Sequence, residues 1–177
     1  MNETQFTEIL EKCLKKELKG YEVKRNENLI YKVIVNENMQ FNPKNPKKPK
    51  RGNLSFQTDL MIKKNDLPLV VIETKFGGFS THDVLTYSTK ALKHKEVYPY
   101  LRYGFVVGGV KIIQNRFFTH NLGFDFAIAI EDINNLRSFL DLVKRQIKNS
   151  EMLLKIMKEK NKTKLFSSNL VVENGKK

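Results

Sequence analysis

Residues 55–75, SFQTDLMIKKNDLPLVVIETK, decide the fold because they predict a β-hairpin. Its first arm, about Leu54 to Lys63, is apolar and rich in residues that favour strands. A cluster of turn residues follows at 64–68, where Asn and Asp begin the turn and Pro68 is expected to stop the ladder. Residues 69–72, LVVI, then predict a short and largely buried strand.

This hairpin brings two carboxylates and a lysine together. If the turn is centred near Asp66, Asp59 falls opposite Glu73, and Lys75 lies on the same face as Glu73 because strand side chains alternate. Two like charges buried side by side need a cation between them, and oxygen-only ligands suit Mg²⁺, for which Mn²⁺ can substitute. The lysine adds a second positive charge that could orient or activate a water, or stabilise a pentavalent phosphate.

The pattern resembles the PD-(D/E)xK nuclease superfamily, which includes restriction endonucleases, junction resolvases and RecB-type nuclease domains. The matching residues are Asp59, then thirteen residues, then Glu73-Thr74-Lys75, with Thr58 in place of the name-giving proline. The resemblance implies an α/β, restriction-endonuclease-like fold with a mixed central β-sheet flanked by helices and a C-terminal helical region. It implies that Asp59, Glu73 and the backbone carbonyl of Thr74 hold Mg²⁺, that Lys75 assists the attacking water, and that cleavage leaves 5′-phosphate and 3′-hydroxyl ends.

Length and composition favour one soluble domain. The chain has 177 residues, of which 40% are hydrophobic, enough to form a core. We assign residues 1–150 to the nuclease core and 151–177 to a helical extension with a frayed tail. No apolar run of membrane-spanning length and no signal peptide is present, and the single cysteine, Cys13, is interpreted as a core residue. These features predict a cytoplasmic protein, of prokaryotic or phage origin by the resemblance, with no membrane partner.

The net charge of +13 favours a polyanionic partner, and nucleic acid over membrane because no basic helix has a bulky apolar counter-face. Residues 42–52 contain three prolines, no acidic residue and five cations, so they predict an irregular basic loop just upstream of Asp59. We expect this loop to contact the phosphates of double-stranded DNA, including in the minor groove; the alternative is a solvated connector. The candidate DNA-binding residues of the loop are Lys44, Lys47, Lys48, Lys50 and Arg51.

The first part of the chain predicts a helix followed by strands. Residues 4–19 have the apolar spacing of a helix with one buried stripe, closed by Gly20. In several branches of the superfamily a glutamate of this helix points into the metal site. Glu8, Glu11 and Glu17 could take that role, but none is assigned to it, because a solvated helix glutamate is the simpler interpretation of each. Strand-like segments follow at 21–25 and 29–35.

After the hairpin, Ser80 or Thr81 can cap a helix that ends near His94 or Lys95. Tyr87, on a face shared with Asp83 and Lys90, resembles the tyrosine of the Gln-xxx-Tyr motif of RecB-type nucleases, and is a candidate DNA-contacting residue. The alternative is a half-buried packing tyrosine. The histidines His82 and His94 have no partner at ligand spacing, so we interpret them as surface or capping residues.

The remaining segments predict two further buried strands and a long helical region. The strands are expected at 103–108 and 124–130, with a basic and aromatic segment at 111–121 that could touch DNA or form an edge hairpin. Asp132 is expected to cap the last helical region, which carries an apolar stripe to Ile147 and continues apolar beyond Ser150.

Three functions remain open. The first is a Mg²⁺-dependent DNA endonuclease of restriction type, type II-like, acting as a homodimer because a compact nuclease that cuts both strands usually works as a two-fold pair. The second is a Holliday-junction resolvase or structure-selective repair nuclease with the same active site. The third is a non-catalytic nucleic-acid-binding module that uses the basic loop.

Overall fold

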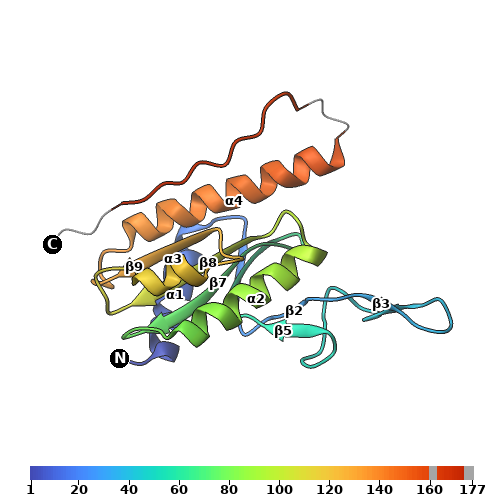
Figure 1. Ribbon diagram of the computed structural model, residues 1–177, viewed down its shortest axis with the longest axis horizontal. Helices are drawn as coiled ribbons and strands as arrows, with labels where there is room; N and C mark the ends of the chain where they lie inside the picture. The colour runs from blue at the N-terminus through green and yellow to red at the C-terminus, as the bar shows by residue number, and fades with distance from the viewer. Residues whose placement is uncertain (160–162, 174–177) are drawn as a thin grey trace.

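The computed structural model, in which residues 1–159 and 163–173 are described, is built on a mixed sheet in which the predicted hairpin holds the central position (Figure 1). Its spatial order is β1-β6-β7-β8-β9. β7 is antiparallel to β6 and parallel to β8, so the hairpin joins an antiparallel half to a parallel half. The strands are β1 (Glu22–Arg25), β6 (Leu60–Lys64), β7 (Leu67–Phe76), β8 (Arg102–Gly108) and β9 (Phe126–Ile130).

The hairpin turn is tighter than the sequence predicted. Only Asn65 and Asp66 lie between β6 and β7, and both have positive φ (50° and 65°), which is typical of a two-residue type I′ turn. Pro68 does not stop the ladder: it lies within β7 opposite Lys63, next to a register shift between Ile62 and Lys63. A bulge of this kind tolerates proline because the regular hydrogen-bond pattern is already interrupted there.

Helices cover both faces of the sheet. The helices of the described chain are α1 (Glu3–Glu17), α2 (Thr81–Val97), α3 (Asn115–His120) and α4 (Arg137–Lys158). One hydrophobic cluster joins α1 and α4 to even-numbered β7 residues such as Ile72. A second joins α2 and α3 to odd-numbered ones such as Val71. The alternation of side chains along β7 therefore assigns Glu73 and Lys75 to the α2 face and Thr74 to the α1 face.

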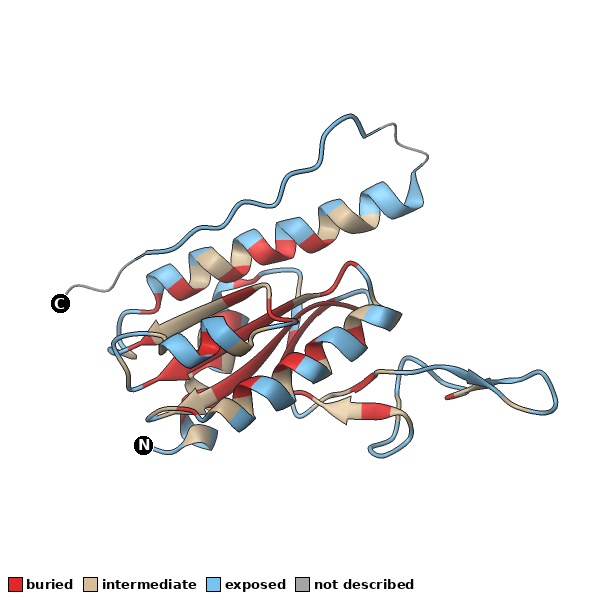
Figure 2. Cartoon of the chain, in the orientation of Figure 1, coloured by how far each residue is buried: buried red, intermediate tan, exposed pale blue. Residues whose placement is uncertain are grey.

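Residues 26–58, between β1 and β6, form a projecting extension that the sequence did not predict as a unit. At the base of the extension, β2 (Asn28–Ile30) pairs with β5 (Ser55–Gln57). In its outer part, β3 (Ile34–Val35) pairs with β4 (Phe41–Asn42). Most of the outer part is exposed, whereas the three middle strands of the main sheet, β6, β7 and β8, are mostly buried (Figure 2). The expected strand at 29–35 is therefore divided between β2 and β3. The expected first strand of the hairpin, from Leu54 to Lys63, is divided between β5 and β6.

Several predicted boundaries were wrong. Asp132 accepts a hydrogen bond from the backbone N–H of Asn134 in a turn, and α4 begins only at Arg137. The segment at 111–121 contains the short helix α3 and not an edge hairpin. Residues 163–173 have no regular secondary structure, and the rest of the predicted tail lies outside the described residues.

Within residues 1–159 and 163–173, we find no helix with both the length and the apolar character needed to cross a bilayer.

Candidate active site

Asp59 and Glu73 meet at the end of β6, as the hairpin predicted. The last regular pair of the ladder is Leu60 opposite Ile72, so the next position places Asp59 opposite Glu73. The turn alone, counted back from Lys64 opposite Leu67, would place Asp59 opposite Ile72. The bulge at Ile62/Lys63 adds the one residue that corrects the register.

Glu73 is fully buried, with 0% of its surface exposed. Its Oε1 accepts a hydrogen bond from the hydroxyl of Tyr103 at 2.6 Å and lies 3.7 Å from Nζ of Lys90. Its Oε2 is buried and meets no donor in the described part of the chain. Burial, and after it the neighbouring Asp59, raise the pKa of Glu73, while Lys90 and Tyr103 lower it, and the net result is a pKa of about 7.

Asp59 is fixed by the strand opposite it. Its Oδ2 accepts hydrogen bonds from the backbone N–H of Thr74 (2.7 Å) and from Thr74 Oγ1 (3.1 Å). Thr74 Oγ1 in turn lies 2.8 Å from Oγ1 of Thr7, which connects the site to α1. The N–H and C=O of one strand residue point to the same side, so the carbonyl of Thr74 is on the side of β7 that its N–H shares with Asp59.

Two lysines approach the acids from different directions. Lys75 Nζ lies 3.3 Å from Glu3 and 3.5 Å from Asp83, so it pairs with these flanking acids rather than with the central two. Burial opposes its charge, but Tyr87 and these two acids raise the pKa of Lys75 above its ordinary value. It is therefore protonated at neutral pH, and can supply charge and hydrogen bonds but cannot accept a proton.

Lys90, which the sequence placed on the same helical face as Tyr87, is the cation in contact with Glu73. Its Nζ also donates to the carbonyl of Gln57 at 3.3 Å and lies 5.0 Å from the centre of the Tyr87 ring. Lys75 lies 5.5 Å from the same ring. The half-buried ring of Tyr87 thus lies between the two lysines. This position fits both interpretations, a packing tyrosine and a DNA-contacting residue.

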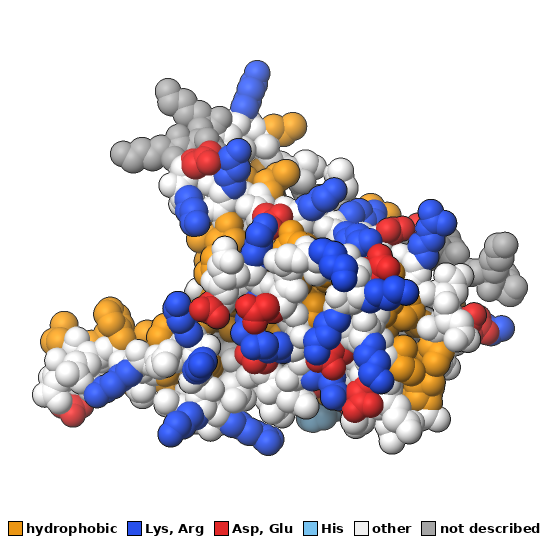
Figure 3. All heavy atoms as spheres, turned by 180° about the vertical axis from the view of Figure 1, so that it is seen from behind, with side chains coloured by type: hydrophobic (Ala, Val, Ile, Leu, Met, Phe, Trp, Pro, Cys, Tyr) orange, Lys and Arg blue, Asp and Glu red, His pale blue; other side chains and the backbone are white. Residues whose placement is uncertain are grey.

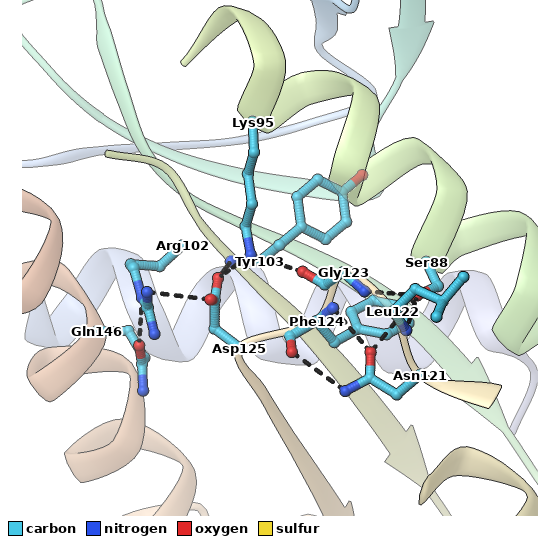
Figure 4. A network of polar contacts seen from close by, with 10 residues as sticks. All are labelled: Ser88, Lys95, Arg102, Tyr103, Asn121, Leu122, Gly123, Phe124, Asp125 and Gln146. Atoms are coloured by element: carbon cyan, nitrogen blue, oxygen red, sulfur yellow. Dashed lines mark hydrogen bonds and ion pairs between the residues drawn. The ribbon is translucent and has the colours of Figure 1, made fainter. Parts of the chain in front are cut away.

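A polar network at the start of β8 holds Tyr103 in place (Figure 4). Asp125 accepts a hydrogen bond from the backbone N–H of Tyr103 (2.6 Å). It also forms ion pairs with Lys95 Nζ (2.8 Å) and Arg102 Nη1 (3.0 Å). Arg102 Nε also donates to Oε1 of Gln146 on α4 at 3.0 Å. Both ends of the Tyr103 residue are thereby fixed, because its backbone is held by Asp125 and its hydroxyl by Glu73.

His94 was wrongly interpreted as a surface or capping residue. It is buried on α2, its Nε2 lies 3.1 Å from the carbonyl oxygen of Leu29, and its ring stacks on Tyr103 at 5.7 Å between centroids. Burial lowers the pKa of His94 to about 4, so its ring is neutral at physiological pH and Nε2 donates to Leu29. His94 therefore joins α2 to β2 at the base of the extension.

None of the three candidate glutamates of α1 lies at the acids. Glu8 and Glu11 pair with Arg25 at 3.1 Å and 2.9 Å, and Glu17 pairs with Lys144 at 3.4 Å. The first-helix acid that reaches the site is Glu3, through Lys75. Sequence reasoning overlooked it because it lies in the first turn, before the apolar stripe that set the expected face.

The predicted basic loop is irregular, and its five cations, Lys44, Lys47, Lys48, Lys50 and Arg51, are exposed. Only part of it lies near the acids. Arg51 and Gly52 line a cleft of about 420 Å³ together with Asp59, whereas Lys47 pairs with Asp66 at the opposite end of the hairpin. The other lining residues of the cleft are Tyr31, Ser55, Phe56, Gln57, Tyr87 and Lys90.

The acids fit a hard divalent cation held with few protein ligands. Among the described residues, no three His, Cys, Asp or Glu side chains gather as a metal-binding group. The candidate set is therefore the carboxylates of Asp59 and Glu73 plus the Thr74 carbonyl. Mg²⁺ is commonly held by one or two carboxylates, with waters and substrate phosphates completing its shell. The unpaired Oε2 of Glu73 is the observation that favours a cation here.

The sequence matches no protein-family model, and comparisons with curated proteins and with solved structures likewise find no match.

Proposed function

We propose that this protein is a Mg²⁺-dependent DNA endonuclease with a restriction-endonuclease-like fold of the PD-(D/E)xK type. The observation that carries the proposal is the pair formed by the fully buried Glu73 and the partly buried Asp59. When ionised, both carboxylates are hydrogen-bond acceptors, so neither can satisfy the other, and Oε2 of Glu73 has no donor in the described chain. A buried acceptor of this kind costs folding free energy, which a bound cation would recover.

In this proposal Asp59, Glu73 and the carbonyl of Thr74 hold the metal ion. The Tyr103 hydroxyl holds one oxygen of Glu73, and Thr74 holds one oxygen of Asp59. These hydrogen bonds set the orientation of both carboxylates, so their second oxygens would be positioned before a metal ion binds. Bound Mg²⁺ would neutralise charge on the phosphate and lower the pKa of an attacking water. Mn²⁺ would substitute because it accepts the same oxygen ligands.

Lys75 and Lys90 supply positive charge on either side of Tyr87. Lys75 is fixed by Glu3 and Asp83, so its ammonium group is pre-positioned to bind a phosphate oxygen or to orient the attacking water. Lys90 partly neutralises Glu73 in the free protein. When a cation binds the acids, electrostatic repulsion would favour release of Lys90 toward the phosphate of the substrate.

Double-stranded DNA is the proposed substrate because the chain carries a net charge of +13 and the cleft at Asp59 is lined by Arg51 and Lys90. A non-catalytic binding module would have the same charge but no use for two apposed acids, one of them fully buried. A type II-like enzyme that cuts both strands would act as a homodimer, with one active site per strand.

Cleavage of mixed plasmid and phage DNA with Mg²⁺ tests the proposal. The informative variants are Asp59→Ala and Lys75→Ala, and Lys93→Ala is the matched control because Lys93 lies on α2 but pairs with Glu96. We expect discrete fragments from the wild type and the control, and loss of cleavage in the two site variants. Cleavage that persists in Asp59→Ala would contradict the assignment of the acids.

A four-way junction separates the restriction enzyme from the resolvase. Preferential cleavage of the junction over a duplex of the same sequences would assign the site to a structure-selective nuclease. If neither substrate is cut and Mg²⁺ does not bind the folded protein, the active-site proposal fails, and the binding module becomes the better account.

A further inference from the structure

The outer part of the extension is a thin ribbon whose tip is apolar. β3 and β4 pair Ile34 with Asn42 and Val35 with Phe41, and the loop 36–40 joins them. Phe41 is 67% exposed and Met39 is 82% exposed, and Val33, Ile34 and Val35 are also exposed. Figure 3 shows apolar side chains gathered on this projection beside lysine and arginine side chains. We call residues 31–54 the arm and residues 33–41 its tip.

The tip loop has a defined conformation. Oδ1 of Asn36 accepts hydrogen bonds from the backbone N–H groups of Asn38 (3.0 Å) and Gln40 (2.9 Å). Two backbone hydrogen bonds close the loop, from Asn36 to the carbonyl of Gln40 and from Met39 to the carbonyl of Asn36. Met39 has φ of +59°, a left-handed conformation that a non-glycine residue adopts only where its surroundings impose it. The loop thus presents Met39 outward.

The base of the arm is fixed to the body close to Asp59. Tyr31 stacks on Phe56 with 4.0 Å between ring centroids, and its N–H donates to the carbonyl of Leu54. His94 holds β2 through Leu29, and both the N–H and the hydroxyl of Thr58 donate to the carbonyl of Glu27. Five residues, 31–35, separate Ile30 from the loop, and only Ile34 and Val35 of these are in a strand, so the loop lies at most about 20 Å from this base.

The charge of the arm on either side of the tip indicates which kind of partner would cover it. An isolated two-stranded ribbon with exposed apolar residues is only marginally stable, and a cluster of this kind marks an interaction surface. The arm carries six cations, all outside its tip, and one acid, Glu37, which lies in the tip loop. Two arms of identical charge would repel one another, whereas a nucleic-acid groove attracts them. The cations are Lys32, Lys44, Lys47, Lys48, Lys50 and Arg51.

We propose that the arm lies in a groove of duplex DNA, with its cations on the phosphates and with Met39 and Phe41 inserted between base pairs as an apolar wedge. Methionine and phenylalanine are side chains that insert between base steps, where they unstack and kink the duplex. For its partner this inference rests on the proposed function, but it does not require cleavage. It adds a means of recognition by DNA deformability, since flexible steps are the easiest to unstack.

The test is binding of the full chain, without divalent cations, to a duplex of roughly 30 base pairs, about three helical turns. A set of such duplexes carries 2-aminopurine at different positions, because its fluorescence rises when it is unstacked. The test variant is Met39→Ser/Phe41→Ser. The control is Met157→Ser/Phe166→Ser, which removes the same residue types from α4 and from residues 163–173, where they are 56% and 79% exposed.

We expect the tip variant to bind DNA about 10-fold more weakly and to lose the fluorescence rise, while the control matches the wild type. Equal affinity and equal fluorescence for the tip variant and the wild type would overturn the proposal, as would a wild type that does not bind duplex DNA. Loss of self-association by the tip variant in the absence of DNA, measured by sedimentation, would assign the tip to a second copy and also overturn it.

These outcomes are independent of the nuclease proposal. If the wild type cleaves DNA and the tip variant behaves like it, the active-site proposal stands and the wedge proposal fails. If the tip variant loses DNA binding but the wild type never cleaves DNA, the wedge proposal stands and the active-site proposal fails.

Discussion

The hydroxyl of Tyr103 donates a 2.6 Å hydrogen bond to Oε1 of Glu73, and both side chains are fully buried. This bond stabilises the ionised form of a carboxylate that burial would otherwise keep protonated. It also leaves Oε2 as the one oxygen of Glu73 that has no donor within the described residues. Tyr103 is therefore a positioning residue, which acts on the site through Glu73.

Tyr103→Phe should weaken Mg²⁺ binding about 10- to 100-fold, the usual cost of removing a group that orients a metal ligand. It should also raise the pKa of Glu73 further, because the hydrogen bond that opposes the shift is lost. Isothermal titration with Mg²⁺ at several pH values measures both effects. The matched control is Tyr100→Phe, since Tyr100 is nearly buried but lies outside the Glu73 contacts. Unchanged affinity in Tyr103→Phe would show that Glu73 needs no such support.

The pKa of Glu73 gives stability a defined pH dependence. Its pKa rises from 4.5 to about 7 on folding, so between these values the folded state binds more protons than the unfolded state. Stability therefore falls as pH rises through this window, by about 3 kcal/mol for a shift of this size. Glu73→Gln should remove this loss and be more stable than the wild type at pH 8 without metal. His94, whose pKa is lowered, contributes the opposite slope below about pH 6.5, equally in both proteins.

Mg²⁺ should counteract the same loss. Ligands that bind only the folded state stabilise it, and the metal competes with the proton of Glu73, so the gain in melting temperature should be larger at pH 8 than at pH 6. Thermal unfolding of wild type and Glu73→Gln, with and without Mg²⁺, checks both statements. A wild type whose pH profile matches that of Glu73→Gln would show that Glu73 titrates normally.

Periodicity was sufficient to predict that the hairpin brings Asp59 opposite Glu73, because the run before Glu73 had to be a strand with alternating side chains. It was not sufficient to predict how this register arises. The sequence suggested a five-residue turn, whereas the structure uses two residues and a bulge at Ile62/Lys63. The two arrangements give the same pairing, and the choice between them depends on local hydrogen bonds that no pattern of apolar residues encodes.

The contacts that complete the site come from elsewhere in the chain. Lys90 and Tyr103 contact Glu73, and Glu3 contacts Lys75, from three different elements, and their approach depends on how the helices pack on the sheet. One signal was present: a tyrosine at the start of the otherwise apolar strand 103–108, whose hydroxyl would need a partner if buried. Lys90 was placed on the face of Tyr87, but helical spacing alone could not direct that face toward Glu73.

The turn of the hairpin offers a test of the fold that is independent of the site. Asp66 has φ of +65° at the second position of the turn, where glycine is the most favourable residue. Asp66→Gly should therefore raise stability by about 0.5 kcal/mol, even though it removes the exposed ion pair with Lys47. Asp66→Pro should destabilise the protein, because proline cannot adopt a positive φ. Urea unfolding of both variants measures the difference, and a stabilising proline would contradict the turn.

The two lysines should have separable effects on Glu73. Lys90 Nζ lies 3.7 Å from Glu73 and lowers its pKa, whereas Lys75 pairs with Glu3 and Asp83. Lys90→Met should therefore raise the pKa of Glu73. The pH at which Mg²⁺ begins to stabilise the folded protein should then rise by a measurable fraction of a pH unit. Lys75→Met should leave this pH nearly unchanged but lower the cleavage rate about 100-fold or more, the size of effect expected when one group that stabilises transition-state charge is removed.

Lys93→Met is the control for both variants, because Lys93 lies on the same helix as Lys90 but is exposed and pairs with Glu96. Mg²⁺ protection measured against pH by thermal unfolding, together with cleavage rates at saturating Mg²⁺, separates the two roles. If Lys75→Met shifts the Mg²⁺ protection curve and Lys90→Met does not, then Lys75 rather than Lys90 is the cation that neutralises Glu73. In that case the ion pairs of Lys75 with Glu3 and Asp83 would have to be exchanged in solution for contacts with the central acids.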